Sequence, residues 1–240
     1  MPQINIHRAN ERGYHDYGWL KSRHSFSFND YFNPVREDFG VLRVLNDEVI
    51  QPDSYFSMHQ QKNLEVVLIP LKGKLLYKTP DGQSTTLEND EAMVISTGTG
   101  INHSFGNGSK HEILELLQLW IYPKIKDIEP RKQVLLFPAS ERKNKLDIIV
   151  KPDLISDILY INQDIWISRI ELSADNTLDY KLRYIGNIVM VFVIEGSILI
   201  NSSGEIAGSR DSVEITGADD NVSIMATAPS DLLIIESVAD

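Results

Sequence analysis

Short apolar runs recur along most of the chain, and turn residues separate them. The clearest runs are LEVVLIPL (64–71), KLLYKT (74–79), EAMVIST (91–97), LLQLWIYP (116–123), VMVFVIE (189–195), SILINS (197–202) and DLLIIESV (231–238). Glycine, proline and aspartate mark the turns between such runs, as is typical of β-strands and their connections. Strong helical periodicity is scarce, so the pattern predicts an all-β fold, either a sandwich or a barrel.

The two halves of the chain carry similar patterns. VVLIPLKGKLLYKTPDGQ (66–83) is similar to VMVFVIEGSILINSSGE (189–205), because each has an apolar strand, a charge, a glycine, a second strand and a turn with glycine. Downstream, EAMVISTG (91–98) parallels DSVEITG (211–217). This repeat is too long for a solenoid unit, so it predicts two copies of one β-domain.

A charged segment that contains prolines, PKIKDIEPRKQ (123–133), lies between the two similar halves. It predicts an N-terminal domain over residues 1–125, a linker over 126–133 and a C-terminal domain over 134–240. All 6 histidines precede this segment. Any imidazole chemistry is therefore expected in the N-terminal domain, and the C-terminal domain is expected to be structural or to bind a partner.

Composition narrows the class of partner. The formal net charge is -11, with 23 Lys and Arg against 34 Asp and Glu, and no Lys/Arg-rich run is present. Such a surface repels a phosphate backbone and an anionic membrane, so we expect no direct nucleic-acid or membrane binding. The chain has 0 Cys, which excludes disulfides and thiolate ligands, and its polar start has no secretory h-region. A cytoplasmic protein is the expectation.

The segment SMHQQKNLEVV begins like a strand that binds metal. Residues two apart in a strand share a face, so His59 and Gln61 point together, and Glu65 does so if the strand stays regular. His103 and Phe105 have the same spacing in a second segment. A metal site forms if the two segments face one another, although a strand histidine is more often an ordinary packed residue.

The segment HSFSFNDYF (24–32) carries Phe26 and Phe28 two residues apart. We interpret them as aromatic residues of a strand that pack into the core. The alternative is an aromatic wall that holds a flat ligand, with Phe26 lining the pocket.

Several motifs together resemble the pirin family. They are NERGYHDYGWLKSRHSFSFNDYFNP (10–34), FGVLRVLNDEVI (39–50), STGTGINHS (96–104) and LLQLWIYP (116–123). The chain is most similar to bacterial members that resemble quercetin 2,3-dioxygenase. The resemblance is dense to about residue 133 and continuous beyond it. It implies a bicupin, with two β-barrel (double-stranded β-helix) domains and a metal in the N-terminal one only.

The resemblance also implies which residues hold the metal. Family members bind iron or another divalent metal through three His and one Glu, and several open flavonols with dioxygen. Here His59 and His103 match the family motifs, but Gln61 stands in place of a ligating His and Phe105 in place of the ligating Glu. A neutral amide oxygen is a poor donor for a transition metal, and Phe105 offers none. We therefore expect binding of Fe, Ni, Mn or Zn to be weak or absent.

Three functions follow as hypotheses, and the sequence leaves open whether the chain is an enzyme. The first choice is a metal-poor protein that binds a small aromatic or apolar molecule beside Phe105, or regulates a partner. The alternative is a quercetinase-type dioxygenase in which Glu65 joins His59 and His103 as ligand and also acts as the catalytic carboxylate. The third is a regulator that acts by binding a partner protein.

Overall fold

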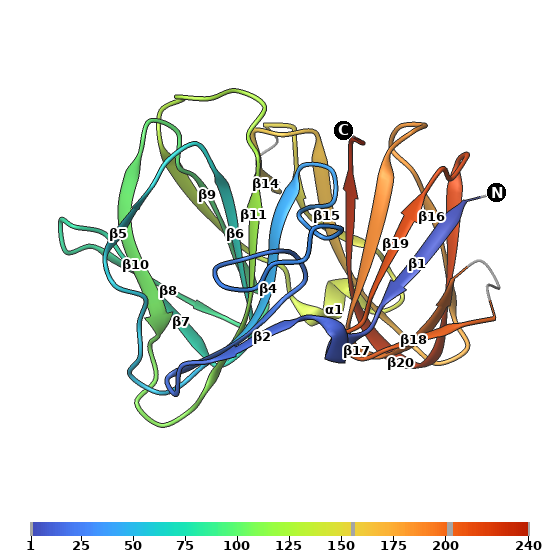
Figure 1. Ribbon diagram of the computed structural model, residues 1–240, viewed down its shortest axis with the longest axis horizontal. Coiled ribbons are helices and arrows are strands. Elements are labelled where there is room, and N and C mark those ends of the chain that lie inside the picture. The colour runs from blue at the N-terminus through green and yellow to red at the C-terminus, as the bar shows by residue number, and fades with distance from the viewer. Residues whose placement is uncertain (1, 155–156, 201–203, 240) are drawn as a thin grey trace. The chain divides into compact units, whose positions relative to one another are not determined.

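The computed structural model describes residues 2–154, 157–200 and 204–239, and strands dominate it (Figure 1). The chain divides into two compact units. We call Gly13–Phe137 with Asp153–Gln163 the N-terminal unit, and Met1–Arg12, Pro138–Pro152 and Asp164–Asp240 the C-terminal unit. The prediction of an all-β chain with two β-domains is confirmed, and the α-helix of the described part, α1 (Ala139–Arg142), is short.

The N-terminal unit contains two antiparallel sheets. The 7-stranded sheet has the order β12 (Arg131–Leu136), β9 (Glu91–Ser96), β6 (Glu65–Lys72), β11 (Leu114–Ile121), β4 (Leu42–Ile50), β3 (Leu20–His24) and β2 (Gly13–Asp16). The 4-stranded sheet has the order β5 (His59–Gln61), β10 (Ile101–Asn107), β7 (Lys74–Lys78) and β8 (Ser84–Glu88). Within this unit, Figure 1 shows β5 and the green strand β10 across from β6 and β11. The short strand β14 (Leu159–Tyr160) also lies in this unit.

The core of the N-terminal unit lies between these two sheets. Val66 and Leu68 on β6 pack from the larger sheet, while Leu75 and Tyr77 on β7 pack from the smaller one, and all four are fully buried. The alternation of inward and outward side chains along each strand follows from the two-residue period of β structure. On β6, the even-numbered positions thus face the interior between the sheets.

The C-terminal unit is a second antiparallel assembly with its own core. Its sheet runs in the order β1 (Gln3–His7), β19 (Ser212–Thr216), β17 (Ile188–Ile200), β20 (Asn221–Ser237), β15 (Ile165–Leu172) and β13 (Asp147–Lys151). In addition, β16 (Thr177–Lys181) pairs with β20, and β18 (Ile206–Gly208) pairs with β17. Its buried cluster is almost entirely Val, Ile, Leu and Ala.

The predicted domain boundaries differ from the observed division at the start of the chain, at the linker, and at Asp153–Gln163, which was predicted in the C-terminal domain but belongs to the N-terminal unit. Residues 1–12 belong to the C-terminal unit, because β1 pairs with β19 along its whole length. The predicted linker 126–133 does not end where expected, since Arg131 begins β12, which pairs with β9. His7 therefore lies in the C-terminal unit, and the expectation that all histidines lie in the first domain is wrong for this residue.

The two apolar runs 189–195 and 197–202 were expected to be separate strands, but the described part of them is one strand, β17. Its pairing with β20 is irregular between Val193 and Ile198, and Gly196 there has φ +91. Gly73 at the equivalent place of the N-terminal repeat has φ +84 and separates β6 from β7. The equivalent glycine therefore lies at an irregularity within β17 in the C-terminal unit, but separates β6 from β7 in the N-terminal unit.

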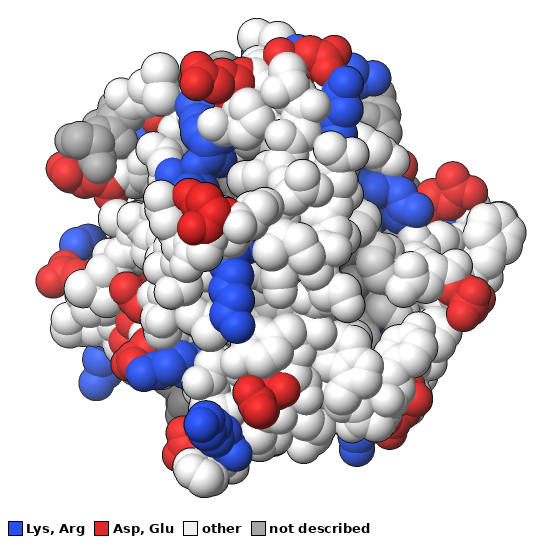
Figure 2. Space-filling model, turned by 90° about the vertical axis from the view of Figure 1, so that its left-hand side faces the viewer, with Lys and Arg blue, Asp and Glu red and all other residues white. Residues whose placement is uncertain are grey.

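Charges of both signs are interspersed on the face shown in Figure 2, and no continuous basic area is visible there. Among the described residues, no helix is long and apolar enough to cross a membrane.

Candidate functional site

The smaller sheet brings together the four side chains singled out by the histidine motifs. β5 and β10 are antiparallel neighbours in which His59 lies opposite His103, and Gln61 lies opposite Ile101. Directly opposed residues of an antiparallel pair project to the same face, and so do residues two apart. His59, Gln61, His103 and Phe105 therefore share the face that carries the core residue Ile101.

The two imidazoles form the centre of this group. Their ring centroids are 4.8 Å apart. His59 Nδ1 donates to the Ser57 carbonyl at 2.8 Å, which leaves Nε2 with a lone pair when the ring is neutral. His103 Nδ1 lies 3.2 Å from the Tyr77 hydroxyl. Burial, and then the charge of His59, lower the pKa of His103 to about 4, so that His103 is neutral at physiological pH.

Three buried polar atoms at this place lack a hydrogen bond partner: His103 Nε2 and both amide atoms of Gln61. His103 is 0% exposed and Gln61 is 6% exposed. Buried polar groups are nearly always satisfied in folded proteins, so an unsatisfied group in a native site has to be explained. A water molecule, an ion or a polar ligand atom would satisfy them.

Phe105 makes the neighbouring part of the site apolar. Its side chain is buried at 1% exposure. Its ring centroid is 4.8 Å from that of Phe56, 5.9 Å from that of His103 and 6.3 Å from that of His59. An aromatic ring, with no lone pair to offer a cation, therefore lies against both imidazoles.

Glu65 does not join this group, which corrects the expectation that it shares the face of His59. The chain leaves strand conformation between β5 and β6, where Asn63 has φ 53. Glu65 and Val66 are adjacent on β6, so their side chains point to opposite faces of the sheet, and Val66 is the one that faces the core. Its Oε2 accepts from Ser96 Oγ at 2.7 Å, and burial is the main cause of its raised pKa.

A metal set of His59, Glu65 and His103 is accordingly not assembled. Within residues 2–154, 157–200 and 204–239, no group of three or more His, Asp or Glu side chains is placed to hold a metal ion. The donors that the site does provide are two imidazoles and the amide oxygen of Gln61.

Beside the imidazoles lies a cavity of about 320 Å³ between the two sheets. Its lining is Tyr17, Leu20, Ser22, His24, Phe28, Asn29, Glu48, Phe56, Ser57, His59, Phe105, Gln118 and Trp120. The residues come from both sheets of the N-terminal unit, and rings form much of the wall. Ligand sites are typically concave and mostly apolar, with a few polar groups that fix orientation, and their volumes are about 300–1,000 Å³.

The aromatic segment after β3 contributes Phe28 to this cavity, and Phe26 is not part of its lining. Phe28 lies 5.3 Å from Trp120 and 5.1 Å from His24, measured between ring centroids. Phe26 is buried elsewhere, with the Arg36 guanidinium 5.5 Å from its ring centroid. The prediction of Phe26 as a pocket residue is wrong because β3 ends at His24, so strand alternation does not extend to the phenylalanines.

The wall across from the imidazoles carries a buried acid that the sequence did not single out as functional. Glu48 on β4 is 2% exposed and lines the cavity. Burial, and then the charge of Asp47, raise its pKa to about 8. Gln118 on β11 is oriented to satisfy both its neighbours: its nitrogen donates to Glu48 Oε1 at 3.3 Å, and its oxygen accepts from Trp120 Nε1 at 3.2 Å.

A line of hydrogen bonds continues this wall toward β2. His24 Nδ1 donates to Asn46 Oδ1 at 2.8 Å, which leaves His24 Nε2 to accept from His15 Nδ1 at 3.1 Å when the ring is neutral. His24 is 1% exposed and also lines the cavity. The cavity thus has two polar sides, the imidazole pair and the wall of Glu48 and His24.

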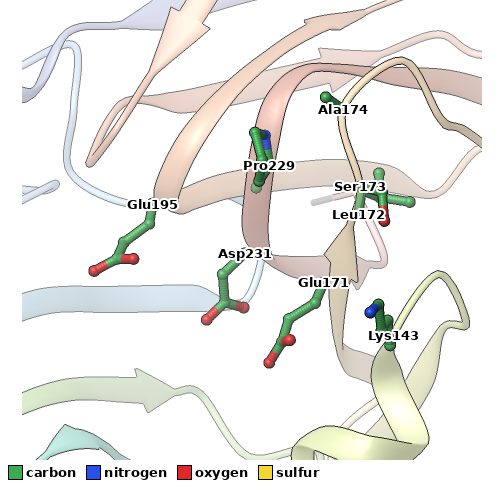
Figure 3. Close-up of a pocket in the computed structure, with 9 residues that line it drawn as sticks. Lys143, Glu171, Leu172, Ser173, Ala174, Glu195, Pro229 and Asp231 are labelled. Carbon is green, nitrogen blue, oxygen red and sulfur yellow. The ribbon is translucent and has the colours of Figure 1, made fainter.

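A second hollow, of about 530 Å³, lies in the C-terminal unit (Figure 3). The carboxyl groups of Glu171, Glu195 and Asp231 point to the same side of it. Two of the three are already paired, because Glu171 accepts from Arg142 at 2.9 Å and Asp231 from Arg169 at 2.6 Å. These pairs neutralise most of the local charge, so we assign this hollow no ligand.

The family assignment rests on sequence comparison. A sequence model of the family Pirin matches residues 5–121, and one described as the quercetinase C-terminal cupin domain matches residues 148–237. The quercetin 2,3-dioxygenase of Escherichia coli K12 is 33% identical over 97% of this chain and 98% of its own. This chain belongs to the pirin family. Its two units are the two cupin domains of a bicupin, as the sequence motifs predicted.

Solved structures of pirins agree with this assignment. YhhW from Escherichia coli has a TM-score of 0.93 and 32% identity, and the match covers 99% of each chain. A second structure of YhhW, in complex with nickel(II), has a TM-score of 0.92 and 31% identity, over 99% of this chain and 100% of that one. A pirin of this architecture therefore binds a transition metal.

The residues of the present chain do not fit the three His and one Glu that the family motif implies. Where the family motif has a second histidine two residues after His59, this chain has Gln61, whose neutral amide is a weak metal ligand. Where the motif has a glutamate two residues after His103, this chain has Phe105. Glu65 does not replace that glutamate, because its side chain is turned toward Ser96. The unpartnered Gln61 amide and His103 Nε2 still leave polar capacity at this place.

Sequence reasoning missed His24, Glu48 and Gln118 as cavity residues. A usable signal was present for Gln118, because it interrupts a strand that is otherwise largely apolar and buried. For Glu48 the signal was its parity, since it shares a strand face with the buried residues Val44 and Ile50. A polar residue at an inward position of such a strand has to be hydrogen-bonded or to contact a ligand.

Proposed function

We propose that this pirin-family protein binds a flat, largely apolar small molecule in the cavity of its N-terminal unit, holds metal weakly, and is not an efficient quercetin dioxygenase. The observation that carries the proposal is Phe105, which is buried against both imidazoles where the family motif has a ligating carboxylate. The same substitution removes the carboxylate that would take the substrate proton in a quercetinase.

The cavity supports the binding of a planar ring system. Phe28, Phe56 and Trp120 supply faces and edges for stacked or edge-to-face contacts, which are worth about 0.5–1.5 kcal/mol each beyond burial. Apolar surface removed from water adds about 25 cal/mol per Å². The polar atoms of His59 and Glu48 lie on different sides of the lining and would orient the ligand.

A metal-dependent dioxygenase is the second candidate, and one observation favours it. Both amide atoms of Gln61 and Nε2 of His103 are buried without hydrogen bond partners, which is expected of metal ligands when no ion is bound. A divalent metal held by His59, His103 and Gln61 would supply Lewis-acid chemistry to an enol substrate. Glu65 is not available as ligand or base in this arrangement, because it is bound to Ser96.

Restoring the family motif tests the proposal. We expect untagged wild-type protein, incubated with Fe²⁺ or Ni²⁺ and then gel-filtered, to retain well under one metal per chain and to oxidise quercetin negligibly. The double variant Gln61→His/Phe105→Glu should retain about one metal per chain. Its melting temperature should rise with Ni²⁺, because a carboxylate buried at residue 105 is uncompensated without the cation.

The single variants Gln61→His and Phe105→Glu are the matched controls. Each should retain an amount of metal per chain between that of the wild type and that of the double variant. Stoichiometric metal and quercetin turnover in the wild type would overturn the proposal in favour of the dioxygenase. A wild type that binds neither metal nor any aromatic probe would also overturn it, and would favour the regulator that acts by binding a partner protein.

A further inference from the structure

The polar wall across from the imidazoles has no part in the family's metal motif, and its arrangement is specific. We propose that Glu48, oriented by Gln118, is a specificity residue that hydrogen-bonds an oxygen substituent of the aromatic ligand. The inference rests on the proposed function, because it requires that an aromatic molecule enters the cavity. It adds the chemical class of that molecule, an oxygenated rather than a pure hydrocarbon ring system.

Glu48 has an oxygen that the protein leaves unsatisfied. Its side chain lines the cavity and is almost entirely buried. Hydrogen bonds with Asn46 and Ser22 act to lower its pKa against the larger effect of burial, yet Oε2 has no partner in hydrogen-bonding geometry. Burying a carboxyl group without a full set of hydrogen bonds is unfavourable by several kcal/mol in most settings. A ligand atom in the cavity would supply the missing bond.

The other oxygen of Glu48 is held in place. Gln118 Nε2 donates to Oε1, and the Gln118 amide is fixed in turn by Trp120 Nε1. A neutral carboxyl group whose Oε1 accepts from an amide carries its proton on Oε2. Oε2 therefore presents an O–H donor, and the complementary ligand atom is a hydroxyl, ether or carbonyl oxygen.

The charged and titratable groups around Glu48 are few. His24 faces it from β3 and His59 lies across the cavity, while Asp47 precedes it on β4 and has the opposite parity. Its direct cross-strand neighbours on the two sides are Ser22 and Leu116. None of the described residues that line the cavity is a Lys or Arg, so the wall is suited to a neutral ligand oxygen rather than to an anionic group.

A purely structural role predicts a different behaviour. Glu236 of the C-terminal unit is a buried acid with both oxygens satisfied by the protein. Glu65 Oε1 also lacks a partner, but only Glu48 of these two lines the cavity, where a ligand atom can reach it. Replacing an incompletely satisfied buried acid by an apolar residue of similar volume is often neutral or stabilising. Glu48→Leu should therefore keep or raise the melting temperature while it weakens binding, which is the pattern of a residue retained for function.

Equilibrium dialysis with 2-naphthol and naphthalene at pH 7 tests the inference. The two probes have the same ring system and differ by one oxygen. Wild-type protein should bind 2-naphthol about 3–10-fold more tightly than naphthalene, which corresponds to one hydrogen bond. Glu48→Leu should remove this preference, and Glu48→Gln should retain part of it because the amide can still donate.

Glu65→Gln is the matched control, since Glu65 is a second buried glutamate of the same unit that points away from the cavity toward Ser96. It should leave the preference for 2-naphthol unchanged. If wild-type protein binds both probes equally, or if Glu48→Leu keeps the preference, the inference is overturned while the proposed function stands. If wild-type protein binds neither probe, the proposed function fails with it.

Discussion

At the scale of single residues, Glu48 links the cavity to the pH dependence of folding. Its pKa is raised from 4.5 to about 8 in the folded protein, mainly by burial. Below pH 4.5 both states hold the proton and its contribution to stability is complete. As the pH rises from 4.5 to 8, the unfolded chain releases the proton first, so stability falls by up to about 1.4 kcal/mol per pH unit.

Urea unfolding of wild type and Glu48→Gln at several pH values measures this contribution. We expect the difference in unfolding free energy between the two proteins to decrease steadily as the pH rises from 5 to 8, and to level off above it. Subtracting the variant removes the pH-dependent contributions of all groups that the two proteins share. A difference that does not change with pH would show that Glu48 is ionised in the folded protein.

At the scale of strands, sequence patterns gave most of the elements and the pairing of the histidine segments. The apolar runs at 64–71, 74–79 and 91–97 correspond to β6, β7 and β9. Two-residue periodicity also placed His59 with Gln61, and His103 with Phe105. These successes share a cause, because side-chain direction within a regular strand is set locally.

The errors arose where the strands stop. Strand alternation was assumed to continue from His59 to Glu65, although the chain leaves strand conformation between β5 and β6. It was also assumed to reach Phe26, which lies beyond the end of β3. Periodicity contains no information about such breaks. The assignment of residues 1–12 to the C-terminal unit depends on a pairing between β1 and β19 that joins distant parts of the chain. Long-range pairing of this kind is set by tertiary packing rather than by local sequence.

The end of β20 shows how one buried acid fixes a neighbouring connection. Glu236 is 0% exposed, and its oxygens accept from the Tyr180 hydroxyl, the Arg183 backbone and the Asn187 amide, each at 2.7 Å. Glu236→Ala should reduce the free energy of unfolding by about 2–4 kcal/mol, because it leaves buried donors without acceptors. Urea denaturation and amide exchange of residues 182–187 would measure the loss.

Glu195→Gln is a suitable control, since Glu195 is an exposed glutamate of the same unit. It should change stability by less than about 0.5 kcal/mol. The loss of stability in Glu236→Gln should lie between the losses in Glu236→Ala and Glu195→Gln. The glutamine keeps the shape of the side chain but places an amide nitrogen against one of the donors. Equal stability of Glu236→Ala and wild type would show that water replaces the carboxylate.

At the scale of the whole molecule, the first residues of the chain stabilise the C-terminal unit while the cavity belongs to the N-terminal one. Arg8 donates to Asp211 Oδ2 at 3.0 Å and to Glu205 Oε1 at 2.6 Å, and Asp211 is largely buried. Arg8→Ala should weaken the C-terminal unit by about 1–3 kcal/mol, since it removes a hydrogen bond to a buried carboxylate. Amide exchange in β19 should accelerate accordingly, because β1 covers its edge.

The same variant should leave 2-naphthol affinity unchanged, because every residue that lines the cavity belongs to the N-terminal unit. Arg8→Lys is the conservative control, and it should recover part of the lost protection because an ammonium can still pair with Asp211. A fall in 2-naphthol affinity in Arg8→Ala would show that the two cupin domains are energetically coupled. Unchanged affinity with faster exchange in β19 would mean that the second cupin domain can lose stability without altering the candidate binding site.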